Sequence, residues 1–143
     1  MTLAKLTLLG FLAGFVAVLI FHQGLWYLFE LFGFTPFLSR AWALDPIPPF
    51  GVPTVISKAF WGGVWGAVLA LLFQNLRGGA YWGAWIVVGA VAPTLVAFFV
   101  VPPIKGQPLP LLWPGLAAGL AINAFWGLGT ALILRLLQAI GKS

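Results

Sequence analysis

Residues 81–101 read YWGAWIVVGAVAPTLVAFFVV, a run without a charged side chain that is long enough to cross a bilayer as one α-helix. Such a helix needs roughly 20 mainly apolar residues, because each residue rises only about 1.5 Å. Three further apolar segments accompany this one. The sequence therefore predicts an all-α integral membrane protein, a four-helix bundle that forms one transmembrane domain. The expected spans cover about residues 4–31, 53–76, 81–101 and 114–139 of the chain 1–143.

The composition of the chain indicates that lipid is its main solvent. Only 6% of the residues are charged and 62% are hydrophobic, and the mean hydropathy is +1.09. A soluble domain carries about a quarter charged residues. Backbone amides in hydrocarbon need internal partners, which leaves helices or closed barrels. The apolar runs are continuous rather than alternating, so helices are expected.

The connections between the spans contain most of the prolines. The longest, over about residues 32–52, is expected to lie outside the membrane on the outer side. Within it, Thr35 and Pro36 favour a short interfacial helix that runs to Ala43. At the end of the third span, Pro102–Pro103 is expected to stop the helix.

The cations are scattered singly among apolar segments, a pattern that marks membrane faces rather than a nucleic-acid site. Four cations are expected on the membrane side of the termini, and three on the opposite side. The first group is Lys5, Arg77, Arg135 and Lys142, and the second is Arg40, Lys58 and Lys105. This small bias predicts cytoplasmic termini. Insertion in both orientations remains the alternative.

A short motif occurs twice. Ala59-Phe60-Trp61-Gly62 in the second span recurs as Ala124-Phe125-Trp126-Gly127 in the fourth. This repeat suggests two tandem helical hairpins in the same orientation, a parallel 2+2 repeat. The alternative is that each boundary between loop and membrane uses similar Pro, Gly and Trp chemistry.

Small residues at four-residue spacing run along three of the spans. In lipid, close approach through such residues is a main source of helix association. The expected packing positions are Gly10, Gly14, Gly62, Gly66, Gly115, Gly119 and Gly127.

Four polar side chains interrupt the apolar spans at similar depths, in the outer half of the bundle by helical rise. They are His22, Gln23, Thr94 and Asn123. One interpretation is a small binding cavity beside a helix that Pro93 kinks. The other is that these residues make separate interhelical hydrogen bonds and anchor depth. Glu30 is expected to reach the headgroup region, with an ion pair to His22 as the alternative.

Catalysis and cofactor binding find little support in the sequence. The chain has a single histidine, no cysteine, and one methionine, the initiator Met1. Haem, zinc and Ser/His/Asp chemistry therefore lack ligands in a suitable pattern. We expect no enzyme activity, no metal and no cofactor. The tryptophans that could stack on a pigment or quinone are interpreted instead as membrane-facing bulk; they are Trp61, Trp65, Trp82 and Trp85.

Three segments carry a resemblance to known proteins. Phe21-His22-Gln23-Gly24, Pro48-Pro49-Phe50-Gly51-Val52-Pro53 and Ala59-Phe60-Trp61-Gly62-Gly63 resemble small, uncharacterised bacterial inner-membrane proteins with four predicted helices. The resemblance implies an inner-membrane location and a topology over nearly the whole chain. It implies no activity and no catalytic residue.

Two functions are consistent with these features. The leading hypothesis is a non-enzymatic accessory or scaffolding component of a bacterial inner-membrane assembly, because packing positions are abundant and embedded ionisable groups are scarce. The alternative is a small homo-oligomeric channel or transporter that uses the polar layer. The expected partners are the lipid bilayer and either further copies of the chain or a larger membrane complex.

Overall fold

A computed structural model describes residues 1–37, 39–110 and 113–141. The all-α four-helix fold is confirmed, with four helices long and apolar enough to cross a membrane. The first and third of these are composite, since each contains one turn of π-helix (η1 and η2). The spans are α1 Leu3–Ala17, η1 Val18–His22 and α2 Gln23–Leu31; α3 Thr54–Leu72; α4 Gly78–Leu95, η2 Val96–Val100 and α5 Val101–Ile104; and α6 Gly115–Ile140.

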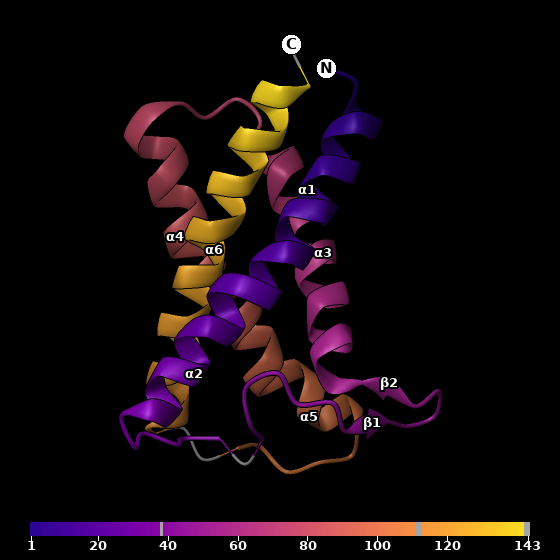
Figure 1. Cartoon of the computed structure of the whole chain (residues 1–143), viewed down its shortest axis with the longest axis vertical. Helices are drawn as coiled ribbons and strands as arrows, with labels where there is room; N and C mark the ends of the chain where they lie inside the picture. Colours follow the sequence, from indigo (N-terminus) through magenta and orange to yellow (C-terminus); the bar gives the residue numbers. More distant parts are fainter. Residues whose placement is uncertain (38, 111–112, 142–143) are drawn as a thin grey trace.

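The helices run up and down between two faces (Figure 1). One face carries both ends of the described chain and the turn after α3, and we call it the terminal face. The opposite face carries the long connection from α2 to α3 and the segment between α5 and α6, and we call it the loop face. Lys142, one of the cations used to predict orientation, lies outside the described residues.

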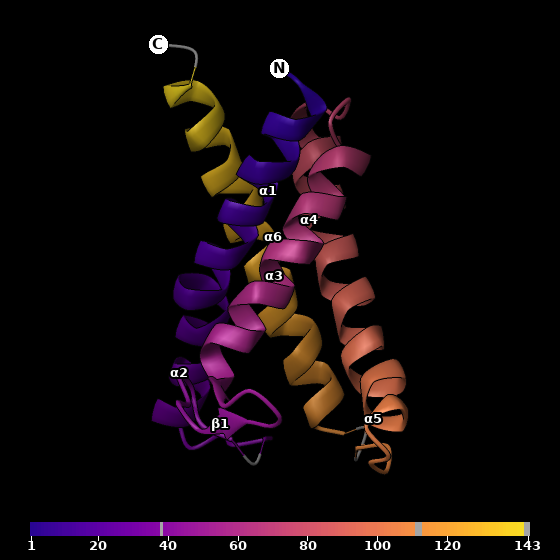
Figure 2. The same cartoon turned by 90° about the vertical axis from the view of Figure 1, so that its right-hand side faces the viewer.

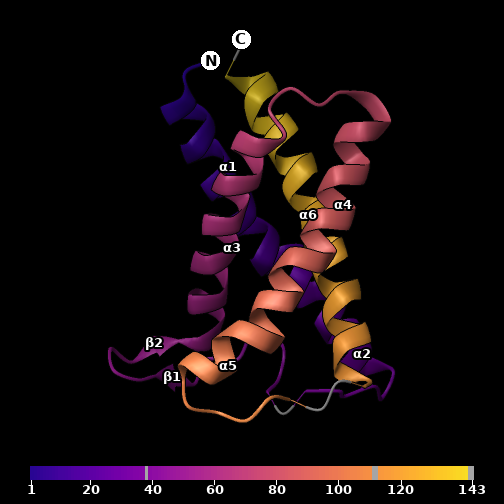
Figure 3. The same cartoon turned by 180° about the vertical axis from the view of Figure 1, so that it is seen from behind.

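The spans pair as two hairpins, α1 with α3 and α4 with α6, and the hairpins meet where α1 packs against α6. Along the described chain, α3 and α4 scarcely touch each other. Figure 3 shows α3 and α4 apart near the terminal face, and Figure 2 shows α5 apart from the start of α3 near the loop face. This pairing has the form expected of tandem hairpins.

Glycines allow the closest approach within the first hairpin. A Cβ added to Gly14 would meet the carbonyl of Gly62, and one added to Gly66 would meet the carbonyl of Gly10. A Cβ on Gly10 would in turn lie 2.7 Å from both the Cβ of Ala70 and the carbonyl of Gly66. The predicted packing positions of the first two spans therefore face each other.

Glycines also allow close approach of α4 and α6 in the second hairpin, except at Gly115. A Cβ on Gly127 would meet the carbonyl of Trp85, and one on Gly119 would lie 3.0 Å from the Phe98 ring. Gly115 has no such neighbour, because its nearest contact would be 3.7 Å away, an ordinary van der Waals distance. The sequence also missed Gly129, which makes room for the Phe21 ring.

One buried hydrogen bond joins the two hairpins. The indole Nε1 of Trp126, on α6, donates to the carbonyl oxygen of Gly14, on α1, at 3.0 Å. Trp126 is 2% exposed, whereas Trp61, its counterpart in the repeated motif, is 59% exposed. The two members of the repeat therefore have different roles, and an internal duplication stays a prediction.

The short helix expected from Thr35 to Ala43 is wrong: residues 35–37 and 39–43 are not helical. Backbone groups there bind the first span instead. The Ala41 amide donates to Glu30 Oε1 at 2.8 Å, and the Trp42 amide donates to Gln23 Oε1 at 2.7 Å. The Trp42 indole donates to the Leu19 carbonyl, within η1, at 2.8 Å. The connection ends in a two-stranded antiparallel ladder, β1 Pro46–Ile47 and β2 Val52–Pro53.

The third span does not stop at its proline pair, contrary to the prediction. Helix α5 begins at Val101 and includes Pro102 and Pro103 near its start. Proline is tolerated in the first turn of a helix, where an amide hydrogen would have no partner. Pro93 lies inside α4, and the π-helical turn η2 begins three residues later. The kink at Pro93 stays a prediction.

We predict that Gly14→Ala lowers the free energy of unfolding by about 1–3 kcal/mol, because the added methyl group overpacks the crossing of α1 and α3. Gly83→Ala is the matched control, since a Cβ there would meet nothing within 4 Å. That control should be neutral or slightly stabilising, because alanine is the better helix former. Denaturant titration in detergent, followed by circular dichroism, measures both variants, and equal stabilities would contradict this packing.

Candidate functional site

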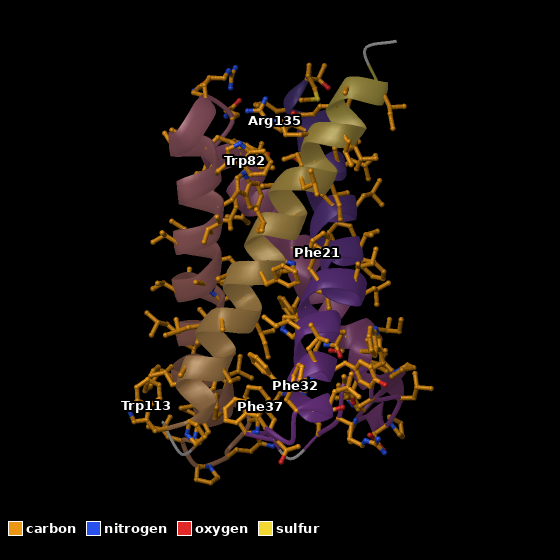
Figure 4. The ribbon with its side chains drawn as sticks, turned by 60° about the vertical axis from the view of Figure 1, so that its left-hand side comes forward. Phe21, Phe32, Phe37, Trp82, Trp113 and Arg135 are labelled. Atoms are coloured by element: carbon orange, nitrogen blue, oxygen red, sulfur yellow. The ribbon has the colours of Figure 1, made fainter. Side chains whose placement is uncertain are left out.

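A cavity of about 240 Å³ lies in the loop-face half of the bundle, and all four spans contribute to its lining. Its walls are mainly aromatic and aliphatic, and they include Trp61 and Trp65 of α3. The Trp26 and Phe37 rings, 4.6 Å apart between centroids, both line it. Figure 4 shows Phe37 near the loop face. Indole rings aside, the polar side chains among the described lining residues are His22, Lys58 and Asn123. We call this space the outer cavity.

Lys58 supplies the positive charge of the outer cavity. It lies in the second turn of α3, and its Nζ is 3.9 Å from the centre of the Trp26 ring. Glu30 and Asp45 are the only acidic residues of the chain, and neither lines the cavity. The Lys58 ammonium is therefore stabilised by an aromatic face and has no carboxylate as a neighbour in the cavity.

His22 is held in place by its sequence neighbour. The Gln23 side chain is completely buried, and its Oε1 accepts a hydrogen bond from the Trp42 amide. Its Nε2 must then be the donor in the 3.0 Å contact with His22 Nδ1. This network assigns the ring hydrogen of a neutral His22 to Nε2. Gln23 thus positions His22 and does not itself line the cavity.

Asn123 is held by the third span. Its Nδ2 donates to Thr94 Oγ1 at 2.8 Å, and Thr94 is completely buried one residue after Pro93. Asn123 and Pro93 both line the outer cavity, whereas Thr94 does not. This bond links α6 to α4 next to Pro93.

The four residues predicted as one polar layer therefore form two hydrogen-bonded pairs. His22 and Asn123 line the outer cavity, and Gln23 and Thr94 lie behind them as partners. Glu30 Oε1 accepts a hydrogen bond from the Ala41 amide, a contact that the sequence did not predict. Its expected position in the headgroup region stays a prediction.

Sequence reasoning missed Lys58 as a site residue, because it was counted among the charges that mark a membrane face. A usable signal was present: Lys58 lies inside the expected span 53–76, about one turn from its start. An ionisable residue inside a span is a functional-site hypothesis by default.

The four tryptophans interpreted as membrane-facing bulk do not all share one environment. Trp61 and Trp65 line the outer cavity, whereas Trp82 is partly exposed on α4 and Trp85 is completely buried.

The outer cavity is suited to an amphipathic anion. Its aromatic walls favour a ligand with an apolar body, and the Lys58 ammonium favours a negatively charged head group on that ligand. The Asn123 and His22 side chains can form hydrogen bonds with the head group. No group of three or more His, Asp or Glu side chains able to hold a metal occurs among the residues that the structure describes. The expectation of no metal and no cofactor stays a prediction.

Comparison with known protein families, with curated proteins and with solved structures finds no match to this chain.

We predict that Asn123 and Thr94 are energetically coupled. A double-mutant cycle with Asn123→Ala and Thr94→Val should give a coupling free energy of about 0.6 kcal/mol, with about 1.7 kcal/mol as the upper end for such bonds in membrane proteins. Thr130→Val is the matched control, because Thr130 Oγ1 donates to the Trp126 carbonyl in its own helix. A cycle of Asn123→Ala with Thr130→Val should show no coupling, and equal values in the two cycles would contradict the assignment.

Proposed function

We propose that this chain is a non-enzymatic transport protein of the bacterial inner membrane that binds a small amphipathic anion in its outer cavity. The single observation behind this proposal is the Lys58 ammonium, which lies within a span, against the Trp26 ring, in a cavity that no acidic side chain lines. The polar layer of the sequence-based transport hypothesis contributes His22 and Asn123 to the same cavity.

The cost of placing a charge in a membrane span supports a role in binding. A lysine near the centre of a membrane helix costs about 2.5–3.5 kcal/mol on insertion scales, and less towards the interface. A cation–π contact such as that of Lys58 with Trp26 offsets about 0.5–2 kcal/mol of this cost. An anionic ligand in the outer cavity would supply the missing counter-charge.

The size of the outer cavity limits its ligand. Pockets for drug-sized molecules usually span about 300–1,000 Å³, so a cavity of about 240 Å³ suits a compact head with a short apolar body. With cytoplasmic termini, as the positive-inside rule favours, the outer cavity lies in the periplasmic half of the membrane. The ligand would then enter from that side.

A second candidate function is the accessory component of a larger membrane assembly. The observation that favours it is the side of the bundle between α3 and α4, where these helices scarcely touch along the described chain and where Trp61 is well exposed. A span of another subunit fits such a side. The native mass after gentle extraction separates the two functions, because a stoichiometric foreign polypeptide favours the accessory role and a homo-oligomer favours transport.

We predict that Lys58→Met abolishes uptake of hexanesulfonate into proteoliposomes. Hexanesulfonate is a suitable probe because it is amphipathic, compact and permanently ionised, so that it crosses lipid slowly by itself. Loss of a charge-assisted interaction should also weaken its binding on the order of tenfold or more. His22→Ala and Asn123→Ala should reduce uptake without preventing assembly.

Lys105→Met is the matched control, because it removes an exposed lysine at the same face that does not line the outer cavity. Its uptake should stay within twofold of the native chain. Equal uptake by the native chain and Lys58→Met, or no saturable binding by the native chain, would overturn the proposal.

A further inference from the structure

A second and larger cavity, of about 570 Å³, lies at the terminal face, at the opposite end of the bundle from the outer cavity. We call it the inner cavity. Figure 4 shows Arg135 at this end of α6, beyond Trp82 on the neighbouring α4. All four spans contribute to its lining, and its polar non-aromatic side chains among the described residues are Lys5, Gln74, Arg77, Arg135 and Gln138.

The charge of the inner cavity has one sign. Three cationic side chains line it, and both acidic residues of the chain, Glu30 and Asp45, lie at the loop face. In the sequence these cations only mark a membrane face. The structure places them around one space, where they repel one another unless an anion lies between them.

Two of the three cations are fixed by contacts at the edge of the inner cavity. Arg135 lies 4.1 Å over the Tyr81 ring, and the Tyr81 hydroxyl donates to the Ala131 carbonyl at 3.0 Å. Arg77 Nη1 donates to the carbonyls of Gln74 and Leu76, at 2.8 and 2.9 Å. Both guanidinium groups keep further N–H donors for a ligand.

The third cation approaches from the other side. A Cβ added to Gly141, at the end of α6, would lie 3.2 Å from Lys5 Nζ. The Lys5 ammonium is therefore close to the end of α6, although it belongs to the first turn of α1. Donors from both ends of the chain thus converge on the inner cavity.

An independent observation points to a ligand. The Trp85 side chain lines the inner cavity and is completely buried, and its indole Nε1 makes no hydrogen bond of good geometry among the described residues. The Tyr81 hydroxyl is its nearest polar neighbour and interacts with it only weakly. A buried donor without a good acceptor destabilises the fold. The buried indole of Trp126 has the Gly14 carbonyl as its acceptor. An acceptor oxygen in the inner cavity would satisfy Trp85 in the same way.

We infer that the inner cavity binds a phosphate group. Phosphate carries up to two negative charges and several acceptor oxygens, which suits donors that converge from three cations and an indole. A single carboxylate would leave more of these donors without a partner. Two sources share this chemistry: the headgroup of an anionic lipid in the adjoining leaflet, and free phosphate.

The test uses the full chain in maltoside micelles, which contain no phosphate. One arm titrates inorganic phosphate by calorimetry. The other arm counts retained phosphatidylglycerol by native mass spectrometry and compares it with diacylglycerol, which has the same acyl chains without the phosphate. Saturable binding of inorganic phosphate identifies free phosphate as a source, and selective retention of phosphatidylglycerol identifies the headgroup. Either result supports the inference.

Variants locate the binding site. Lys5→Gln and Arg135→Gln should each weaken binding on the order of tenfold, and Arg135→Lys should restore part of it. Trp85→Phe should weaken binding severalfold. Circular dichroism checks that each variant is folded, and Lys5→Gln, an exposed position, keeps the test valid if Arg135→Gln does not fold.

Lys105→Gln is the matched control, because it removes a cation at the loop face. Lys58→Met separates this inference from the proposed function, because it should abolish hexanesulfonate uptake and leave phosphate binding unchanged. The inference is overturned if neither ligand binds saturably, or if Lys105→Gln weakens binding as much as Arg135→Gln does.

Discussion

The hydrogen bond from Trp126 Nε1 to the Gly14 carbonyl is the interaction on which the arrangement of the spans depends. Gly14 has two functions at this point, because its missing side chain lets α3 approach through Gly62 while its carbonyl accepts the indole from α6. Helix α1 is thereby fixed against α3 of its own hairpin and against α6 of the other hairpin. In hydrocarbon there is little hydrophobic force between helices, so close backbone contact and a satisfied polar group determine which helices pair. Trp126 and Gly62 also line the outer cavity, so the same contact that joins the hairpins shapes the site.

Much of this fold could be predicted from the sequence, because its decisive features are local. The length of an apolar run determines whether a helix can span the membrane, and glycines four residues apart lie on nearly the same side of a helix. The connection between the first two spans could not be predicted in this way. Its path depends on bonds such as that from the Trp42 amide to Gln23 Oε1, which joins positions far apart in the chain. Thr35 and Pro36 carry a helix-start signal, and these tertiary bonds override it.

In the candidate site, the depth of a side chain in the membrane could be predicted from the sequence, but its direction around the helix could not. Counting the helical rise placed His22, Gln23, Thr94 and Asn123 at similar depths. The direction of a side chain around its helix also depends on irregularities such as the π-helical turn η1, which such counting does not include. For this reason His22 and Asn123 line the outer cavity and their partners lie behind them. Lys58 was missed for a related reason: its position near the end of a span suggested a boundary charge, and only the rotation of α3 places it against Trp26.

The two cavities have a common origin in the way the bundle is packed. Glycine contacts hold α1 closely to α3 and α4 closely to α6, whereas α3 and α4 scarcely touch along the described chain. Residues of α3 and of the third span therefore line a cavity at each end of this side, and each cavity contains cations. A chain with seven lysines and arginines and only two acids cannot neutralise both cavities with its own side chains. Both acids are at the loop face, and Glu30 already accepts a backbone amide there. The packing creates the spaces, and the charge balance of the sequence favours anions as the ligands that we propose for them.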